Sequence, residues 1–292
     1  MKKLLILTLA LCLLLSGCGE RSASLPEPGA APPPPTETAE QIDYELTTVS
    51  YDRTVTADDG TQLMQVSFRL PHLNALSDGA VIETPATPAQ QAALERAETF
   101  NQCFDQWREA GTTEENIASA KAHYAADPAW FGTDGELCYA EELSCTAYRL
   151  GSLVSVAAAY YSYLGGAHPN TVYFSWNFDL DSGIFLTIPE LAADPQAFTL
   201  AVADMMEAQV AETLAQDGLA ISDVYWENYR ETLEKWGSDY AASFDAEGLS
   251  VIFSAYELAP YAAGEQAFHF PYAALERYWS DSGRAALGLD AA

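Results

Sequence analysis

Two neighbouring stretches of this chain alternate between apolar and polar residues. Residues 44–55 alternate loosely and are rich in Thr, Val and Tyr, and residues 61–70 alternate more strictly. The apolar face of the second stretch consists of Met64, Val66, Phe68 and Leu70. Residues 58–60 are Asp-Asp-Gly, a turn signal, so the two stretches predict a β-hairpin.

A helical spacing of apolar residues follows this hairpin. Pro88 suits the first position of a helix, and the apolar residues beyond it recur every three or four positions. These apolar residues are Ala93, Ala97, Phe100, Phe104 and Trp107. Gly111 ends the predicted helix. Thr112 and Glu115 then form a capping-box pattern, which predicts a second, shorter helix through about Tyr124.

The remaining pattern mixes strands and helices in blocks. Predicted strands cover residues 136–163 with a reversal at 150–152, then 171–179, 184–188, 241–244, 249–258 and 266–270. Predicted helices cover residues 195–216 and 222–237, with a short helix after Pro271. Because the strands form hairpins and not regular βαβ units, we expect an α+β fold of antiparallel sheets with packed helices. We place two linked lobes at 42–150 and 151–282.

The N-terminus predicts export and lipid anchoring. Residues 1–17 have two lysines followed by an apolar run that is too short to span a bilayer, as in a signal peptide. Residues 15–18, Leu-Ser-Gly-Cys, resemble the bacterial lipobox, which implies a diacylglycerol on Cys18. Residues 18–41 are rich in proline and lack apolar periodicity, so they predict an extended tether. We therefore expect a lipoprotein anchored to the bilayer on the extracytoplasmic face.

The net charge narrows the choice of partners. The formal charge is -29, and removal of residues 1–17, which hold two lysines and no acid, takes it to -31. Nucleic acid and anionic lipid headgroups both require a basic face, so we expect no nucleic-acid partner. The charge favours a cationic partner, although acidity also serves solubility in many secreted proteins.

Three cysteines remain beyond the anchor, namely Cys103, Cys138 and Cys145. An odd number leaves at least one thiol unpaired in a monomer, so we expect at most one disulfide. Cys103 falls on the apolar face of the predicted helix, where a buried thiol is the simplest interpretation. The sequence has no CxxC motif, which argues against thioredoxin-like and zinc-ribbon sites.

No motif for catalysis or cofactor binding is found. The sequence lacks HExxH, GxSxG, GxGxxG and Walker patterns, and we expect no cofactor. Asp179, Asp181 and Glu190 resemble a weak calcium loop, but Ile184 occupies the position where an EF-hand needs glycine. A glycan hydrolase with paired carboxylates stays open as the alternative, because two carboxylates can meet in space without a motif.

Three stretches of the C-terminal half resemble one family. They are YYSYLGGAH at 160–168, NFDLDSG with LTIPEL within 177–191, and FSAYELAPYAAG at 253–264. They resemble the extracytoplasmic domain of lysozyme-sensing RsiV-type anti-sigma factors and the non-catalytic domain of PdaC-type peptidoglycan deacetylases. The resemblance implies an α+β module at the cell envelope. It makes Tyr163, His168, Tyr256 and Tyr261 the candidate ligand contacts.

The chain departs from both relatives in the parts that signal or catalyse. We find no sigma-binding helix before the signal peptide and no deacetylase domain after the module. We therefore expect binding without enzymatic activity, in a monomer whose ligand is lysozyme, another cationic protein or a peptidoglycan-related molecule. For His168 the alternative is a purely structural turn in which Gly165 and Gly166 relieve steric limits.

Overall fold

The computed structural model describes residues 40–110, 114–132 and 137–289. The chain from Glu40 onward forms one compact unit. The signal peptide, Cys18 and the proline-rich tether lie outside the described residues, as does the capping residue predicted at Thr112. In the described part, no helix is both long enough and apolar enough to cross a membrane.

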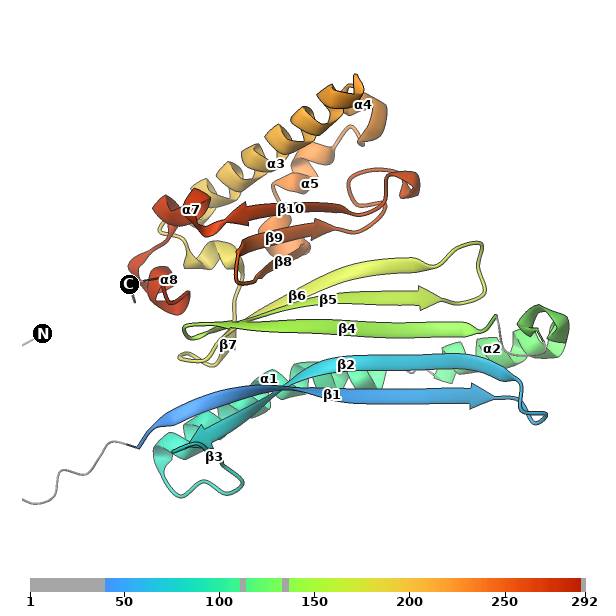
Figure 1. The fold of residues 1–292 in the computed structure, drawn as a ribbon, viewed down its shortest axis with the longest axis horizontal. Helices are drawn as coiled ribbons and strands as arrows, with labels where there is room; N and C mark the ends of the chain where they lie inside the picture. Colours follow the sequence, from blue (N-terminus) through green and yellow to red (C-terminus); the bar gives the residue numbers. More distant parts are fainter. Residues whose placement is uncertain (1–39, 111–113, 133–136, 290–292) are drawn as a thin grey trace, which may run out of the picture. The chain divides into compact units, whose positions relative to one another are not determined.

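A large sheet forms the base of the molecule (Figure 1). Its strands follow the order β1-β2-β4-β5-β6-β7, with β3 paired to β2. Their bounds are β1 (Ile42–Thr56), β2 (Gln62–Ser77), β3 (Ala80–Val81), β4 (Tyr139–Leu150), β5 (Leu153–Tyr163), β6 (Asn170–Asp179) and β7 (Ile184–Phe185). The α+β class and the hairpins at residues 58–60, 150–152 and 181–183 are confirmed.

One strand pair differs from the antiparallel prediction, because β2 and β4 run parallel. The chain between them carries α1 (Pro88–Ala110), α2 (Glu114–Ala126) and the 3₁₀ turn η1 (Pro128–Phe131). A crossover of this length is what parallel neighbours require, whereas a tight turn can only produce antiparallel ones. The predicted helices thus create the parallel pair.

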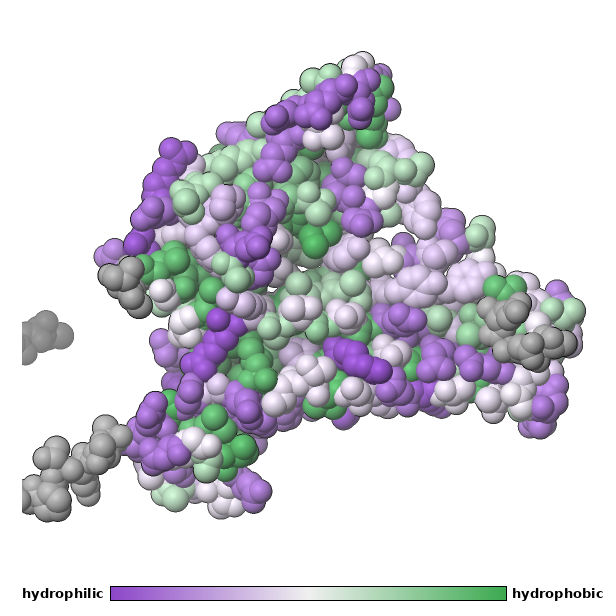
Figure 2. All heavy atoms as spheres, viewed as in Figure 1, coloured by the Kyte–Doolittle hydropathy of each residue, from purple (hydrophilic) through white to green (hydrophobic). Residues whose placement is uncertain are grey.

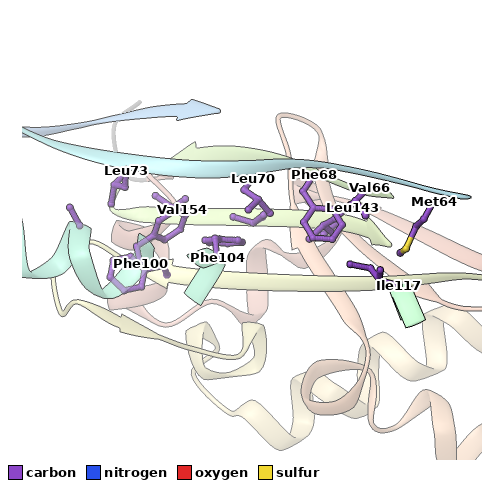
Figure 3. Close-up of a cluster of buried hydrophobic side chains, with 14 of the residues drawn as sticks. Met64, Val66, Phe68, Leu70, Leu73, Phe100, Phe104, Ile117, Leu143 and Val154 are labelled. Carbon is purple, nitrogen blue, oxygen red and sulfur yellow. The ribbon is translucent and has the colours of Figure 1, made fainter. Parts of the chain in front are cut away.

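The first core fills the space between α1, α2 and one face of the large sheet. Figure 3 shows the predicted apolar face of β2 pointing at Phe100, Phe104 and Ile117 of the two helices. Phe100 and Phe104 are essentially inaccessible to solvent, and Phe100 meets Phe178 of β6 with ring centroids 5.5 Å apart. Each such buried side chain contributes about 1.5–3 kcal/mol to stability.

A small sheet lies on the opposite face of β5 and β6 from the helices α1 and α2 (Figure 1). It has the order β10-β9-β8, with β8 (Ala241–Phe244), β9 (Gly248–Phe253) and β10 (Gln266–Pro271). The long helix α3 (Pro195–Asp217) covers it, and a second core of apolar side chains, including Phe198 and Trp236, fills the gap. Short elements complete this part: η2 (Ile188–Leu191), η3 (Tyr261–Ala263), α7 (Tyr272–Leu275), η4 (Glu276–Tyr278) and α8 (Asp281–Ala286).

The helix predicted over 222–237 is divided into three short ones. They are α4 (Ile221–Val224), α5 (Tyr229–Leu233) and α6 (Trp236–Asp239). Tyr225 is extended, and the backbone N–H of Trp226 donates to the carbonyl of Leu258 instead of to a helical carbonyl. The tertiary hydrogen bond therefore replaces the helical one at the break.

Polar side chains of the large sheet join it to the edge of β8. The backbone N–H of Phe244 donates to Ser155 Oγ at 2.7 Å, and Asn177 Nδ2 donates to the carbonyl of Ala242 at 3.0 Å. Ser175 Oγ accepts from the N–H of Ala242 at 2.8 Å. These bonds satisfy an otherwise unpaired strand edge, which would be costly to bury.

The two cores share the strands on either side of the predicted lobe boundary. A boundary at residue 150 would separate β4 from β5, yet these strands pair along their whole length. Leu153 belongs to the second core, whereas the first core extends to Leu180, after which the second core continues from Ile188. Strand β5 contributes to both cores, because Leu153 belongs to the second and Val154, Val156 and Ala158 belong to the first.

Candidate functional site

Two loops that are far apart in the sequence meet at one end of the molecule. Figure 1 shows the β5–β6 loop and the β9–β10 loop at the same side of the fold. The phenol of Tyr261 donates a hydrogen bond to the carbonyl of Pro169 at 3.0 Å. The ring of His168 stacks on that of Tyr261 with centroids 4.1 Å apart and an interplanar angle of 26°. The structure thus brings together two of the four predicted contacts.

Tyr256 extends this cluster outward. Its ring centroid lies 5.4 Å from that of Tyr261, and 55% of the residue is exposed. Its backbone has a φ of 75°, which is unfavourable for a residue with a bulky side chain. Strained residues of this kind concentrate at functional sites, where surrounding structure holds them.

Trp226 is a neighbour that sequence reasoning missed. Its indole Nε1 donates to the carbonyl of Tyr256 at 3.3 Å, and 41% of the residue stays exposed. The available signal was three large aromatic residues around one acid in the sequence 225–229. The sequence predicted a continuous helix over 222–237, whereas the break between α4 and α5 turns the indole toward the β9–β10 loop.

Tyr163, the fourth predicted contact, lies at the end of β5 and pairs with a different aromatic ring. Its ring stacks on Trp130 of η1 with centroids 6.1 Å apart. The pKa of Tyr161 is raised by burial first, then by the charge of Glu142, and also by Tyr163 and Tyr261. We call Trp130, Tyr163, His168, Trp226, Tyr256 and Tyr261 the aromatic surface.

Two acidic groups lie near tyrosines that are outside the defined aromatic surface. Glu142 lies close enough to Tyr161 to raise its pKa, and Glu265 has the same effect on Tyr173 after burial. In Figure 2, hydrophilic residues cover much of the face shown and are interrupted by pale and apolar ones. Exposed aromatic rings on an acidic chain suit a partner that offers apolar and cationic groups.

The one fully buried carboxyl in the described residues belongs to Glu141 and lies elsewhere. Glu141 is 1% exposed beneath α2, and burial raises its pKa. Oε1 accepts from Asn116 Nδ2 at 2.6 Å and from the Tyr160 phenol at 2.9 Å, while Oε2 is buried without a hydrogen-bond partner. A carboxyl enclosed in this way is out of reach of a glycan substrate.

The calcium candidates have other partners. Although burial opposes its charge, hydrogen bonds from Ser182 and Ser152 lower the pKa of Asp179 overall. Glu190 Oε2 accepts from the N–H and the hydroxyl of Thr187 in a capping box. Asp179 and Glu190 therefore serve a turn and a helix cap. Across the described ranges, no three His, Cys, Asp or Glu side chains gather as a metal site.

All three described cysteines are free thiols. Burial raises the pKa of Cys103, and burial together with the proximity of Cys103 raises the pKa of Cys145 to about 12. Cys138 Sγ accepts from Gln62 Nε2 at 3.3 Å. Cys103 lies on the apolar side of α1 as predicted, but it is half-buried and not fully buried.

A groove lies between the large sheet and the small one. Its volume is about 200 Å³, and small residues such as Ser144, Ala157 and Ala159 form its floor. Ser243 and Ile252 of the small sheet form the wall, with Tyr173 among the other lining residues. This groove presents few polar groups, so it offers shape without the convergent chemistry of a small-molecule site.

Comparison with known proteins identifies part of the chain. Residues 189–273 match the family model described as "Protein of unknown function (DUF3298)". No curated protein matches the chain. The matched region holds η2, α3 and the small sheet, within the predicted C-terminal lobe.

Two crystal structures are similar to this chain. A DUF3298 family member from Bacteroides fragilis has a TM-score of 0.57 at 14% identity, covering 84% of this chain and 96% of that one. A DUF3298 family protein from Pseudomonas aeruginosa has a TM-score of 0.48 at 13% identity, covering 82% and 96%. At this identity the first similarity shows a shared fold alone. Residues 189–273 therefore match the DUF3298 family model, and the chain shares its fold with a DUF3298 protein of known structure.

Proposed function

We propose that this chain is a lipid-anchored, extracytoplasmic binding module whose aromatic surface captures a cationic envelope-directed protein, with lysozyme as the first candidate. The signal peptide and lipobox pattern of residues 1–18 support the location. The resemblance of the C-terminal stretches to lysozyme-sensing domains supports the ligand. The aromatic surface supplies the contact.

The exposed ring of Tyr256 is the observation that carries this proposal. Protein interfaces concentrate their binding energy in a few aromatic and Arg residues, and Tyr is enriched among them. Tyr256 is more than half exposed and held at a positive φ, and its carbonyl accepts a hydrogen bond from Trp226. The Tyr256 side chain packs in no hydrophobic core and its backbone is strained, and binding to a partner best accounts for both features.

Charge would assist the encounter. The formal charge of -29 attracts a basic protein over distance, and electrostatic steering raises association rates by about 10–10³ at low salt. Charge alone gives rate more than affinity, so the aromatic contacts supply the specificity. A peptidoglycan-related ligand could stack its sugars on the same rings, but it would gain nothing from this charge.

Alanine substitution at Tyr256 tests the proposal. Binding of purified lysozyme to the chain, measured by calorimetry in 0.15 M salt, should weaken by about 30-fold or more in Tyr256→Ala, the loss typical of a hot spot. Tyr148→Ala is the matched control, because Tyr148 is also exposed but lies near the far end of β4. Equal affinities in both variants would refute the role of the aromatic surface, and no binding by the unaltered chain would exclude lysozyme.

A further inference from the structure

The β9–β10 loop closes on itself immediately after β9. The backbone N–H of Ser254 donates to Glu257 Oε2 at 2.5 Å, and the N–H of Glu257 donates back to the carbonyl of Ser254 at 3.1 Å. The Ser-Ala-Tyr-Glu stretch at 254–257 is thus closed twice, once by the Glu257 side chain and once by a backbone hydrogen bond. Tyr256 is one of the two residues enclosed by these bonds.

Ser254 also ties this loop to the large sheet. The residue is 5% exposed, and its Oγ accepts from the backbone N–H of Tyr173 in β6 at 3.1 Å. Strand β6 begins directly after the loop that carries His168. Both loops of the aromatic surface are therefore attached to β6, the first by direct continuation and the second by this hydrogen bond.

The positive φ of Tyr256 needs this support. A non-glycine residue in that region costs of order 1–3 kcal/mol and persists only where its surroundings determine it. The hydrogen bonds to Glu257 fix the backbone on one side, and Trp226 Nε1 fixes the carbonyl of Tyr256 on the other. Half-buried among these groups, the carboxyl of Glu257 faces the loop, and burial raises its pKa.

We infer that Glu257 is a positioning residue: its carboxylate closes the 254–257 loop and thereby fixes the ring of Tyr256 in the orientation that captures the partner. The effect on partner binding rests on the proposed function, whereas the loop closure does not depend on it. Pre-organisation of this kind strengthens binding because the ring does not have to be ordered when the partner arrives.

Hydrogen exchange in the ligand-free full chain tests the closure directly. In Glu257→Ala the amides of residues 254–257 should exchange at least about tenfold faster, because the closing bond is lost. Glu257→Gln should retain slow exchange, since its amide oxygen still accepts from Ser254. Glu265→Ala, which removes the same charge from an exposed site in the same loop, should leave exchange unchanged. Unchanged exchange in Glu257→Ala would overturn the inference.

Lysozyme binding by the same variants tests the consequence. Glu257→Ala should weaken binding about tenfold, with Glu257→Gln within twofold of the unaltered chain. A loosened loop with undiminished affinity would overturn the positioning role. If the unaltered chain does not bind lysozyme, the proposed function fails for that ligand and the exchange measurement still decides the closure. If Glu257→Ala does not fold, Glu257→Asp replaces it, because it keeps the charge but is one methylene too short to reach Ser254.

Discussion

The phenol of Tyr261 donates a hydrogen bond to the carbonyl of Pro169 across 92 positions of the sequence. This bond connects the β9–β10 loop to the β5–β6 loop, and the ring of His168 stacks over the same tyrosine. Two segments that each look like an ordinary surface turn thus become one surface. The relationship explains why the aromatic residues of this region can act together.

Removal of this one hydroxyl should loosen the β5–β6 loop. In Tyr261→Phe the ring remains but the hydrogen bond is lost, which costs about 0.5–1.5 kcal/mol. Amide exchange at residues 164–170 should accelerate accordingly. Tyr272→Phe is a matched control, because Tyr272 also donates to a backbone carbonyl, that of Asp245. If both variants leave the loop equally protected, the two loops are held by other contacts.

The pH dependence of stability should change when Glu141 is replaced by Gln. Burial raises the pKa of Glu141 in the folded protein, so the native state retains a proton that the unfolded state has released. The contribution of Glu141 to stability is therefore fully present below the unfolded pKa of about 4.3 and is lost as the pH rises through the folded pKa. Glu141→Gln removes this pH-dependent contribution, because the amide does not ionise.

Denaturant unfolding between pH 4 and pH 8 measures the effect. The difference in unfolding free energy between Glu141→Gln and the unaltered protein should shift in favour of the variant as the pH rises. Glu142→Gln is the control, since Glu142 is the exposed neighbour on the other face of β4. A constant difference across this range would mean that Glu141 ionises as freely in the folded state as in the unfolded one.

Thiol reactivity should separate the cysteines by environment. Burial and the nearby Cys103 raise the pKa of Cys145 to about 12, so little reactive thiolate forms at pH 8. Alkylation of Cys145 in the folded protein should be at least about tenfold slower than after denaturation. The denatured, unreduced monomer should yield free thiols at all three positions from Cys103 onward. Loss of two of these thiols would reveal a disulfide.

The lipid anchor predicts labelling at one position. Cells that express the chain with an alkyne-bearing fatty acid in the medium should label it, and Cys18→Ala should remove the label. Cys12→Ala is the control, because Cys12 lies within the predicted signal peptide. Labelling that persists in Cys18→Ala would place the lipid elsewhere.

Local patterns predicted most of the elements but not how they combine. The alternation from Met64 to Leu70 and the helical spacing of Phe100 and Phe104 identify core faces correctly, because side-chain periodicity follows backbone geometry. The parallel pairing of β2 with β4 and the double coverage of β5 depend on contacts between distant segments. No window of the sequence contains that information.

The candidate site shows the same limit. His168, Tyr256 and Tyr261 were found through resemblance, and the structure gathers them into one cluster. Trp226 was missed because its position depends on a hydrogen bond from its backbone to Leu258, which breaks the predicted helix. The sequence does not distinguish Glu257 from the many other acidic residues, because its role depends on the contact with the backbone N–H of Ser254.

The central claim is that the aromatic surface, and not diffuse negative charge, captures the partner. Calorimetric titration of the purified chain with lysozyme, at 0.15 M and again at 0.5 M salt, tests it most directly. At 0.15 M the Debye length is about 8 Å, so attraction between distant charges is already largely screened. The account predicts saturable one-to-one binding that persists at both salt concentrations. Weak attraction that vanishes by 0.15 M salt would contradict it.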